Sequence, residues 1–414
     1  MKEDWIECKL GEILNIERGG SPRPIKEFIT NDENGINWIK ISDATNSGKY
    51  ILKTIQKIKP TGLKNSREVF PGDLLLSNSM SFGKPYIMGI NGAIHDGWLV
   101  IRDNKFLDKN YLFYALASPI TYNQFSQNAK GSTVKNLNIE IVREVTIKVN
   151  PLPIQKGIVK KIEELFSSLD SGIADLKKAQ EQLVIYRQAV LKKAFDLNDK
   201  KYKIEEICTE IFAGGDKPKD FFSDWKTEEC SVPIIANAVA NNGLYGYTKT
   251  ARVLENAITI AGRGSGTGNV ELRREPFVPI VRLITIIPNI EIVKIEFLMY
   301  FLKNLNIKGT GSAIPQLTIP MVKRYEIYLP SLQVQHQIVR EIESRLSVCD
   351  KVEESLKESL EKAKALRQSI LKKAFEGKLL SAEELAKCKA DQDYEPASVL
   401  LEKIKKEKKK NCFG

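Results

Sequence analysis

The feature that most constrains this chain is an internal repeat, because one segment occurs twice in the same register and without a gap. The first copy extends from Gly131 to Phe195 and the second from Gly311 to Phe375, so each matched residue recurs 180 positions later. Both copies end in Leu-Lys-Lys-Ala-Phe. A register kept over about 65 residues indicates a duplicated unit. We therefore expect a molecule with two similar halves, which suits a ligand that also has two halves.

Length and charge limit the class of protein. A chain of 414 residues exceeds one comfortable hydrophobic core, so two or more domains are expected. A hydrophobic content of 42% with 28% charged residues is typical of a globular protein. The formal net charge of +11 favours a polyanionic partner such as nucleic acid, although solubility alone would also explain it. Part of the excess lies in the lysine-rich run 403–410.

The cysteines and the apolar runs indicate a cellular compartment. Six cysteines are scattered along the chain without a C-x-x-C pair, which argues against a zinc knuckle or a disulfide framework. The first residues lack the apolar core of a signal peptide, and no apolar run approaches the ~18 residues that a membrane span needs. These features predict a cytoplasmic protein that is not associated with a membrane.

The two halves have a common plan, in which a strand-rich globular region precedes a long helix. Residues 35–43 largely alternate apolar and polar side chains, as a half-buried strand does, and residues 232–237 are their counterpart. The pair Gly19-Gly20 matches Gly214-Gly215 more loosely. Short helices are expected at residues 111–116 and 297–302. We expect a mixed α/β (α+β) fold with four segments, namely globular regions 1–150 and 198–330 and helical regions 151–197 and 331–414, the last with a C-terminal tail.

Apolar residues recur every seven positions in both helical regions. In the first copy they are Ile162, Leu169, Leu176, Leu183 and Val190, and in the second Ile342, Cys349, Leu356, Ala363 and Ile370. A sustained heptad seam needs a partner helix, so we expect the two helices to pack on each other, antiparallel, about a pseudo-two-fold axis. A short helix is expected from about residue 396 to 406. Its position at the end of the chain is the sole ground for expecting it to pack against the N-terminal segment.

Catalytic groups are hard to find. The chain has only two histidines, His95 and His336, and neither is placed to act as a general base, since Asp96 would point to the opposite face of a strand from His95. No G-x-x-x-x-G-K-[ST] phosphate loop occurs, and no N-P-P-Y or D-P-P-Y tetrapeptide. The glycine-rich loop 262–268 misses the dinucleotide spacing G-x-G-x-x-G and is better explained as a flexible binding loop. We expect no catalytic residue, no metal site and no cofactor on this chain.

The chain has more groups that could bind double-stranded DNA. Reading a duplex needs hydrogen-bond donors and acceptors in a groove, with cations beside the phosphates. The candidates lie in expected loops of both globular regions. In the first region they are Arg18, Ser21, Arg23, Lys40, Asn78, Ser81, Lys84, Lys130 and Lys135. In the second they are Lys217, Lys219, Asn237, Asn241, Tyr245, Tyr247, Arg263, Ser265, Arg273 and Arg274. For any one of them a solvated surface role is the alternative, and the prediction depends on their grouping in matching loops.

The duplicated segment resembles a known family. Residues 329–379 resemble the distal conserved region of specificity subunits from Type I restriction–modification enzymes. Residues 151–195 resemble the central conserved region, and residues 395–400 the C-terminal element. The resemblance covers essentially the whole chain, and its two globular regions are similar to target recognition domains.

The resemblance implies a non-catalytic subunit that reads a bipartite, asymmetric DNA sequence and directs methylation or cleavage by other subunits. Each domain would read one half-site through the major groove, and the helices would set the spacer between them. Two modification subunits, with S-adenosylmethionine chemistry, would dock on the helical regions. Two restriction subunits would add ATP- and Mg²⁺-dependent translocation and cleavage. Base-contacting residues differ among family members, so none is carried over by motif.

Three alternatives stay open on sequence grounds. The chain could serve a related modification-only or combined nuclease–methylase system, because that difference lies in the partner subunits. It could be a coiled-coil adaptor without DNA reading, which would leave the two basic globular regions unexplained. It could also be a self-contained nuclease or methyltransferase with atypical motifs, against which the absence of recognisable catalytic motifs counts.

Overall fold

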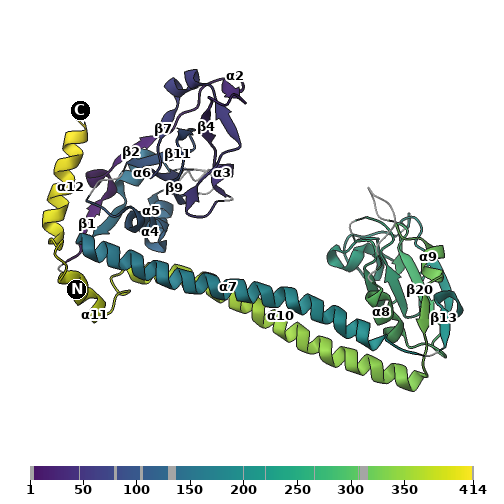
Figure 1. Ribbon diagram of the computed structural model, residues 1–414. Coiled ribbons are helices and arrows are strands. Elements are labelled where there is room, and N and C mark those ends of the chain that lie inside the picture. Colours follow the sequence, from purple (N-terminus) through teal and green to yellow (C-terminus); the bar gives the residue numbers. More distant parts are fainter. Residues whose placement is uncertain are drawn as a thin grey trace. The chain divides into compact units, whose positions relative to one another are not determined.

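The computed structural model describes residues 4–45, 47–78, 82–102, 106–128, 137–198, 200–219, 221–264, 266–305, 307 and 316–412. The chain divides into two compact units. Unit 1 comprises Met1–Asp175 and Ser359–Gly414, and unit 2 comprises Leu176–Glu358. Two long helices, α7 (Leu152–Ala194) and α10 (Leu332–Phe375), each contribute residues to both units (Figure 1).

The globular part of unit 1 contains two five-stranded sheets and a two-stranded ladder. The first sheet has the order β2 (Asn15–Arg18), β11 (Trp98–Arg102), β8 (Leu74–Ser77), β9 (Pro85–Met88) and β5 (Tyr50–Ile51). The second has the order β3 (Ile29–Thr30), β6 (Gln56–Ile58), β4 (Ile36–Ile39), β10 (Gly92–Ile94) and β7 (Arg67–Val69). The ladder pairs β1 (Ile6–Lys9) with β12 (Thr146–Val149).

The first sheet is buried on both faces, which explains the unbroken apolar run in β8. Leu74 and Leu76 belong to one hydrophobic cluster, and Leu75 between them belongs to another. Successive side chains of a strand point to opposite faces, so each face of β8 contacts its own core. One core includes Leu112, from a helix, and the other includes Ile39, from the second sheet. The sheet therefore lies between a helical layer and the second sheet.

The globular part of unit 2 contains a four-stranded sheet, a three-stranded sheet and a two-stranded ladder. The larger sheet has the order β14 (Cys208–Ala213), β20 (Ile284–Pro288), β17 (Ala257–Ile260) and β18 (Val270–Arg273). The smaller has the order β16 (Leu244–Thr248), β15 (Val232–Ile235) and β19 (Val278–Pro279). The ladder pairs β13 (Lys201–Lys203) with β21 (Glu326–Tyr328).

The two globular domains have the same connectivity. The antiparallel order β2-β11-β8-β9 is repeated as β14-β20-β17-β18. The parallel pair β4 and β10 is repeated as β15 and β19, each with an antiparallel neighbour, β6 or β16. The first domain adds β3, β5 and β7 at sheet edges. The duplication therefore extends into the middles of the domains, where the sequences have drifted apart.

Both units also contain shorter helices. Unit 1 has α1 (Leu10–Ile13), α2 (Ile25–Phe28), α3 (Ile41–Thr45), η1 (Pro60–Asn65), α4 (Lys109–Ala117), α5 (Pro119–Asn128), α6 (Ile139–Glu144), α11 (Ala382–Lys389) and α12 (Ala397–Cys412). Unit 2 has η2 (Ile204–Glu206), η3 (Ala240–Gly243), α8 (Ile295–Asn304) and α9 (Ile319–Lys323). The helices predicted at residues 111–116 and 297–302 are confirmed as parts of α4 and α8.

One strand prediction is wrong in its second half. Strand β4 ends at Ile39, and residues 41–45, of which 41–43 were predicted as strand, form α3. The Asp43 carboxylate accepts a 2.9 Å hydrogen bond from the Lys40 amide, and Thr45 Oγ1 donates to the Ile41 carbonyl at 2.9 Å. Local side-chain bonds of this kind give the backbone an alternative to a strand ladder.

Helices α7 and α10 pack on each other, antiparallel, in both units. In unit 1, Ile162 and Ile370 share a hydrophobic cluster, and the Arg367 guanidinium lies 4.4 Å from the centroid of the Phe166 ring. In unit 2, the Arg187 guanidinium lies 2.7 Å from a carboxylate oxygen of Asp350 and of Glu353. Along the heptad seam, Ile162, Val190, Ile342, Cys349, Ala363 and Ile370 are buried, and Leu169, Leu176, Leu183 and Leu356 are partly exposed.

The C-terminal helix α12 packs on the N-terminal part of the first domain, as the sequence suggested. Leu400 and Ile404 are buried in one cluster with Leu10 and Ile13 of α1. At the rim, Lys405 Nζ lies 2.8 Å from Glu12 Oε2. The helix continues to Cys412, beyond the predicted end near residue 406. Within the described residues, no helix is long and apolar enough to cross a membrane.

Candidate nucleic-acid interface

A tight turn between two strands of the first domain is the centre of a polar network. It joins β10 to β11 through His95, Asp96 and Gly97, and the Trp98 amide closes it by donating to the His95 carbonyl at 3.1 Å. The Gly19 amide donates to the Trp98 carbonyl at 2.9 Å. A Cβ at Gly19 would lie 2.1 Å from the His95 carbonyl oxygen, so only glycine allows this approach.

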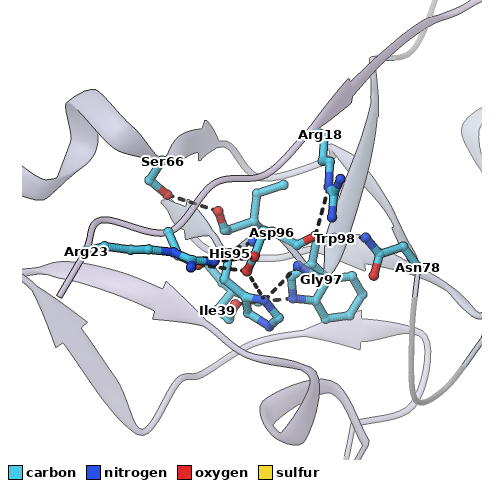
Figure 2. Close-up of polar contacts among 11 residues, drawn as sticks. Arg18, Arg23, Ile39, Ser66, Asn78, His95, Asp96, Gly97 and Trp98 are labelled. Atoms are coloured by element: carbon cyan, nitrogen blue, oxygen red, sulfur yellow. Dashed lines mark hydrogen bonds and ion pairs between the residues drawn. The ribbon is translucent and has the colours of Figure 1, made fainter. Parts of the chain in front are cut away.

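Asp96 collects hydrogen bonds from residues far away in sequence (Figure 2). Ser21 Oγ donates to Asp96 Oδ1 at 2.9 Å, and one Arg23 guanidinium nitrogen lies 3.5 Å from Asp96 Oδ2. The Asp96 carbonyl accepts from Arg18 Nε at 3.2 Å and from Asn78 Nδ2 at 2.8 Å. Burial opposes ionisation, but the Ser21 hydrogen bond and the nearby Arg23 guanidinium hold the pKa of Asp96 below its usual value. The turn therefore carries a fixed carboxylate.

His95 is held in one orientation beside Asp96. Its ring lies near those of Trp38 and Trp98, with centroid distances of 6.1 and 6.4 Å. His95 Nδ1 accepts a 2.8 Å hydrogen bond from the Gly97 amide. Burial lowers the pKa of His95, which favours the neutral ring. A neutral imidazole that accepts at Nδ1 carries its proton on Nε2, so His95 offers a donor there.

Ser21, Arg23 and His95 from this network line a groove of about 1060 Å³ on the first domain. Its basic side chains are Arg23, Lys26 and Lys40, and its polar groups include Ser21, Gln56 and His95, with Trp38 among the lining residues. A concave surface with cations and fixed donors is what binding to phosphates and base edges needs.

The second domain repeats the turn with different side chains. Here Ile280, Val281 and Arg282 join β19 to β20, and the Leu283 amide donates to the Ile280 carbonyl at 3.2 Å. The Gly214 amide donates to the Leu283 carbonyl at 2.8 Å, as Gly19 does to Trp98. The loose sequence match of the two glycine pairs thus corresponds to one backbone arrangement.

The structure brings several sequence candidates of the first domain together. Arg18, Ser21, Arg23 and Asn78 contact Asp96, and Ser21, Arg23 and Lys40 line the groove. Lys84 lies apart, with Nζ 5.1 Å from the centroid of the Tyr86 ring. The candidates Ser81, Lys130 and Lys135 lie outside the described residues.

In the second domain, the side chains of three candidates bond to other residues of the same domain. The Asn237 amide bridges the glycine-rich loop, accepting from the Gly262 amide and donating to the Arg263 carbonyl, both at 2.6 Å. Arg273 Nε donates to Thr259 Oγ1 at 3.1 Å, and burial lowers the pKa of Arg273. Arg274 lies 2.7 Å from Glu296.

The remaining candidates of the second domain are spread over its surface. Lys219, Asn241, Tyr245 and the Arg263 side chain are exposed, and Tyr247 pairs through its backbone with Ser223. Lys217 Nζ lies 3.2 Å from the centroid of the Phe222 ring. Ser265 lies outside the described residues.

Sequence reasoning missed the turn residues themselves. Asp96 and His95 were considered only as a catalytic pair, and Lys26, Gln56 and Arg282 were not considered. The signal that could have found the turns is the pair of matching Gly-Gly dipeptides, since such dipeptides mark close backbone approach. No group of three or more His, Cys, Asp or Glu side chains among the described residues could hold a metal ion.

Comparison with known proteins gives a consistent family. The family model described as "Type I restriction modification DNA specificity domain" matches residues 2–181 and 198–362. A Mycoplasma pneumoniae protein that carries the name of a type I specificity subunit is 32% identical over 340 residues, covering 80% of this chain and 86% of that protein. The EcoKI specificity subunit of Escherichia coli is 23% identical over 452 residues, covering 99% of this chain and 96% of that protein.

Solved structures show the same fold. A chain from a study of complex assembly and conformational transition of the type I R-M system has a TM-score of 0.74 at 19% identity, covering 91% of this chain and 98% of that chain. The HsdS subunit of Thermoanaerobacter tengcongensis has a TM-score of 0.57 at 18% identity, with the same coverage of both chains.

Proposed function

The chain belongs to the family of Type I restriction–modification DNA specificity subunits, and from this we propose that each of its two globular domains reads one part of a two-part DNA target. As a member of this family it determines DNA target recognition and is itself non-catalytic. It is a component of a Type I restriction–modification complex.

The observation that supports a two-part target is the repeated turn on two domains of the same topology. Two backbone hydrogen bonds are common to both turns, but one turn carries His95, Asp96 and Gly97 where the other carries Ile280, Val281 and Arg282. Base edges in the major groove differ in their donors and acceptors, so different side chains on one scaffold select different bases. An asymmetric target follows from two such domains in one chain.

The partner subunits complete the proposal. Two modification subunits would carry S-adenosylmethionine and dock on the helical regions, and two restriction subunits would carry the ATP- and Mg²⁺-dependent steps. No cofactor is assigned to this chain. Because its target is DNA, we place its action in the cytoplasm. The helical segments 151–197 and 331–414 would set the spacer between the two parts of the target.

Exchange of one domain tests the proposal. Residues 1–150 would be replaced by the corresponding domain of another family member, and the hybrid expressed with its modification subunit in a host without other methyltransferases. Mapping of methylated bases across the genome should give a motif with one new part, one unchanged part and the same spacer. The reciprocal exchange of residues 198–330 should change the other part alone.

Two outcomes would contradict this model. A change in both parts after either exchange would mean that the domains do not read independently. Methylation that persists unchanged when this chain is deleted would mean that another subunit reads the DNA, and that this chain serves as an adaptor.

A further inference from the structure

We propose that the turn joining β10 to β11 and the equivalent turn joining β19 to β20 are the base-reading elements of the two domains, with His95 and Arg282 as their hydrogen-bond donors. This inference rests on the proposed function and assigns it to two side chains that the sequence candidates did not include.

The two turns have two backbone hydrogen bonds in common. Trp98 and Leu283 follow the two turns, and the amide of each donates to the carbonyl three residues earlier. The carbonyl of each accepts from a glycine amide, that of Gly19 for Trp98 and that of Gly214 for Leu283. A Cβ at Gly214 would lie 2.7 Å from the Ile280 amide nitrogen, so this approach also depends on glycine. Duplication has therefore preserved the placement of the turn while its side chains changed.

In the first turn, Gly97 leaves room for the His95 ring. A Cβ at position 97 would lie 2.3 Å from His95 Cε1, so any other residue would displace the imidazole. The Gly97 amide, Trp38 and Trp98 fix the ring, and His95 lines the groove beside Arg23 and Lys40. A donor that is fixed before binding loses little conformational freedom when it contacts a base.

In the second turn, Arg282 is exposed and available. Both Val281 and Arg282 have positive φ values, of 53° and 58°, in the left-handed region that non-glycine residues rarely occupy. The Arg282 side chain makes no hydrogen bond or ion pair with the residues that the structure describes. Arg273 and Arg274, by contrast, are engaged within the domain. The strained backbone thus presents a free guanidinium in the equivalent turn, at the position that corresponds to Gly97 of the first domain.

The chemistry of the donors defines what each turn selects. Guanine and adenine offer acceptors at N7, guanine also at O6, and thymine at O4, whereas cytosine presents an amino donor. A single His95 Nε2 donor therefore disfavours cytosine at the contacted position. A guanidinium can bond guanine at O6 and N7 together, so Arg282 favours guanine.

Single substitutions in the intact complex test both assignments. Each variant would be expressed with the modification subunit, and methylated sites would be mapped and their base frequencies compared with those of the wild type. His95→Ala should lower discrimination at one position of one part of the motif by roughly tenfold and admit cytosine there. Gly97→Ala, which displaces the ring without removing it, should do the same. Arg282→Ala should lower discrimination against bases other than guanine at one position of the other part, and Arg282→Lys should restore it only partly.

Matched controls are His336→Ala on α10 and Arg324→Ala after α9, both at exposed positions. Neither should change the motif. Because each variant leaves one part of the motif as an internal standard, an unchanged second part shows that the protein is folded and assembled.

Unaltered motifs in His95→Ala, Gly97→Ala and Arg282→Ala would overturn the assignment, as would loss of discrimination in both parts from one substitution. Failure of the proposed function would look different. In that case the wild-type complex itself would give no two-part motif that depends on this chain.

Discussion

Gln335 Oε1 accepts a 2.7 Å hydrogen bond from the backbone amide of Lys294, which joins the first turn of α10 to the residue that precedes α8. Gln335 Nε2 donates to the carbonyls of Pro330 and Ile292, at 2.9 and 3.0 Å. The side chain is fully buried. One glutamine therefore fixes the long helix to the globular domain of unit 2.

The first domain has the same device. Gln155, which precedes Gln335 by one repeat, accepts from the amide of Asp108 at 2.8 Å and donates to the Asn150 carbonyl at 2.7 Å. Asp108 caps α4, as Lys294 precedes α8. The duplicated helix start thus brings its own anchor to each domain.

Loss of this anchor should destabilise the second domain. Gln335→Ala removes three hydrogen bonds and leaves buried backbone groups without partners, so we expect the free energy of unfolding to fall by about 2–4 kcal/mol. Denaturant unfolding of the purified chain measures the change. The exposed neighbour Gln333→Ala should cost less than about 0.5 kcal/mol. Equal effects of the two substitutions would contradict the anchor role.

The glycine pair of the second domain should differ in its tolerance of a methyl group. Gly214→Ala would place a Cβ 2.7 Å from backbone atoms of Pro279 and Ile280, whereas the nearest atom to a Cβ at Gly215 is 3.7 Å away. We expect Gly214→Ala to destabilise the domain by about 1–3 kcal/mol and Gly215→Ala to be nearly neutral. Thermal unfolding of both variants, measured side by side, checks this. If Gly214→Ala were as stable as the wild type, the turn at Pro279 and Ile280 would be able to shift away from the added methyl group.

Helix α12 should be part of the folded first domain. Ile404→Ala removes a fully buried side chain from the core that contains Leu10 and Ile13, at a cost of about 2–4 kcal/mol. Val399→Ala, on the same helix but 43% exposed, should cost well under 1 kcal/mol. Hydrogen exchange of residues 10–13 should accelerate in the first variant and not in the second. Unchanged protection of these amides in Ile404→Ala would mean that α12 does not stabilise the first domain.

Acid should weaken the attachment of α11 to α7. The Lys161 ammonium, which donates a 2.8 Å hydrogen bond, and the Ser381 amide lower the pKa of Glu384 to about 2. A carboxyl whose folded pKa lies below its unfolded value of 4.5 contributes stability above pH 4.5, and that contribution is lost as the pH falls towards about 2. Glu384→Gln should therefore be less stable than wild type at pH 6, and the difference should shrink by pH 3.

Stability measured against pH for Glu384→Gln and for the neighbouring Glu383→Gln tests this. Glu383 pairs with Lys387 on the exposed side of the same helix. If Glu384→Gln differs from the wild type equally at pH 6 and pH 3, the ion pair with Lys161 is not the cause.

Much of the architecture could be predicted from the sequence. The repeat predicted two halves. The seven-residue spacing of Ile162, Leu169 and Leu176 predicted a helix that needs a partner, since periodicity is a local property of the chain. Strand β4 was predicted too long, because a side chain three residues away, Asp43, turned the backbone at Lys40.

The residues of the candidate site were harder to predict from the sequence. Charge and loop position selected Arg273 and Arg274 together with Arg23, yet the first two bond to other residues of their domain, whereas the third, which also lies near Asp96, lines the groove. Arg282 was missed, because nothing in its neighbourhood in the sequence distinguishes it from other surface arginines. Which cation is free depends on partners that the fold brings from elsewhere in the chain, such as Thr259 or Glu296.

The sequence by itself determined the duplication, the paired helices and the family, because these depend on spacing and repetition along the chain. The tertiary structure alone decided that Gly19 and Gly214 hold equivalent turns and that Asp96 gathers Ser21 and Asn78. These contacts join backbone atoms and side chains tens of residues apart. Their formation depends on the packing of whole sheets, which brings those atoms within hydrogen-bond distance, and the local sequence pattern does not specify which atoms meet.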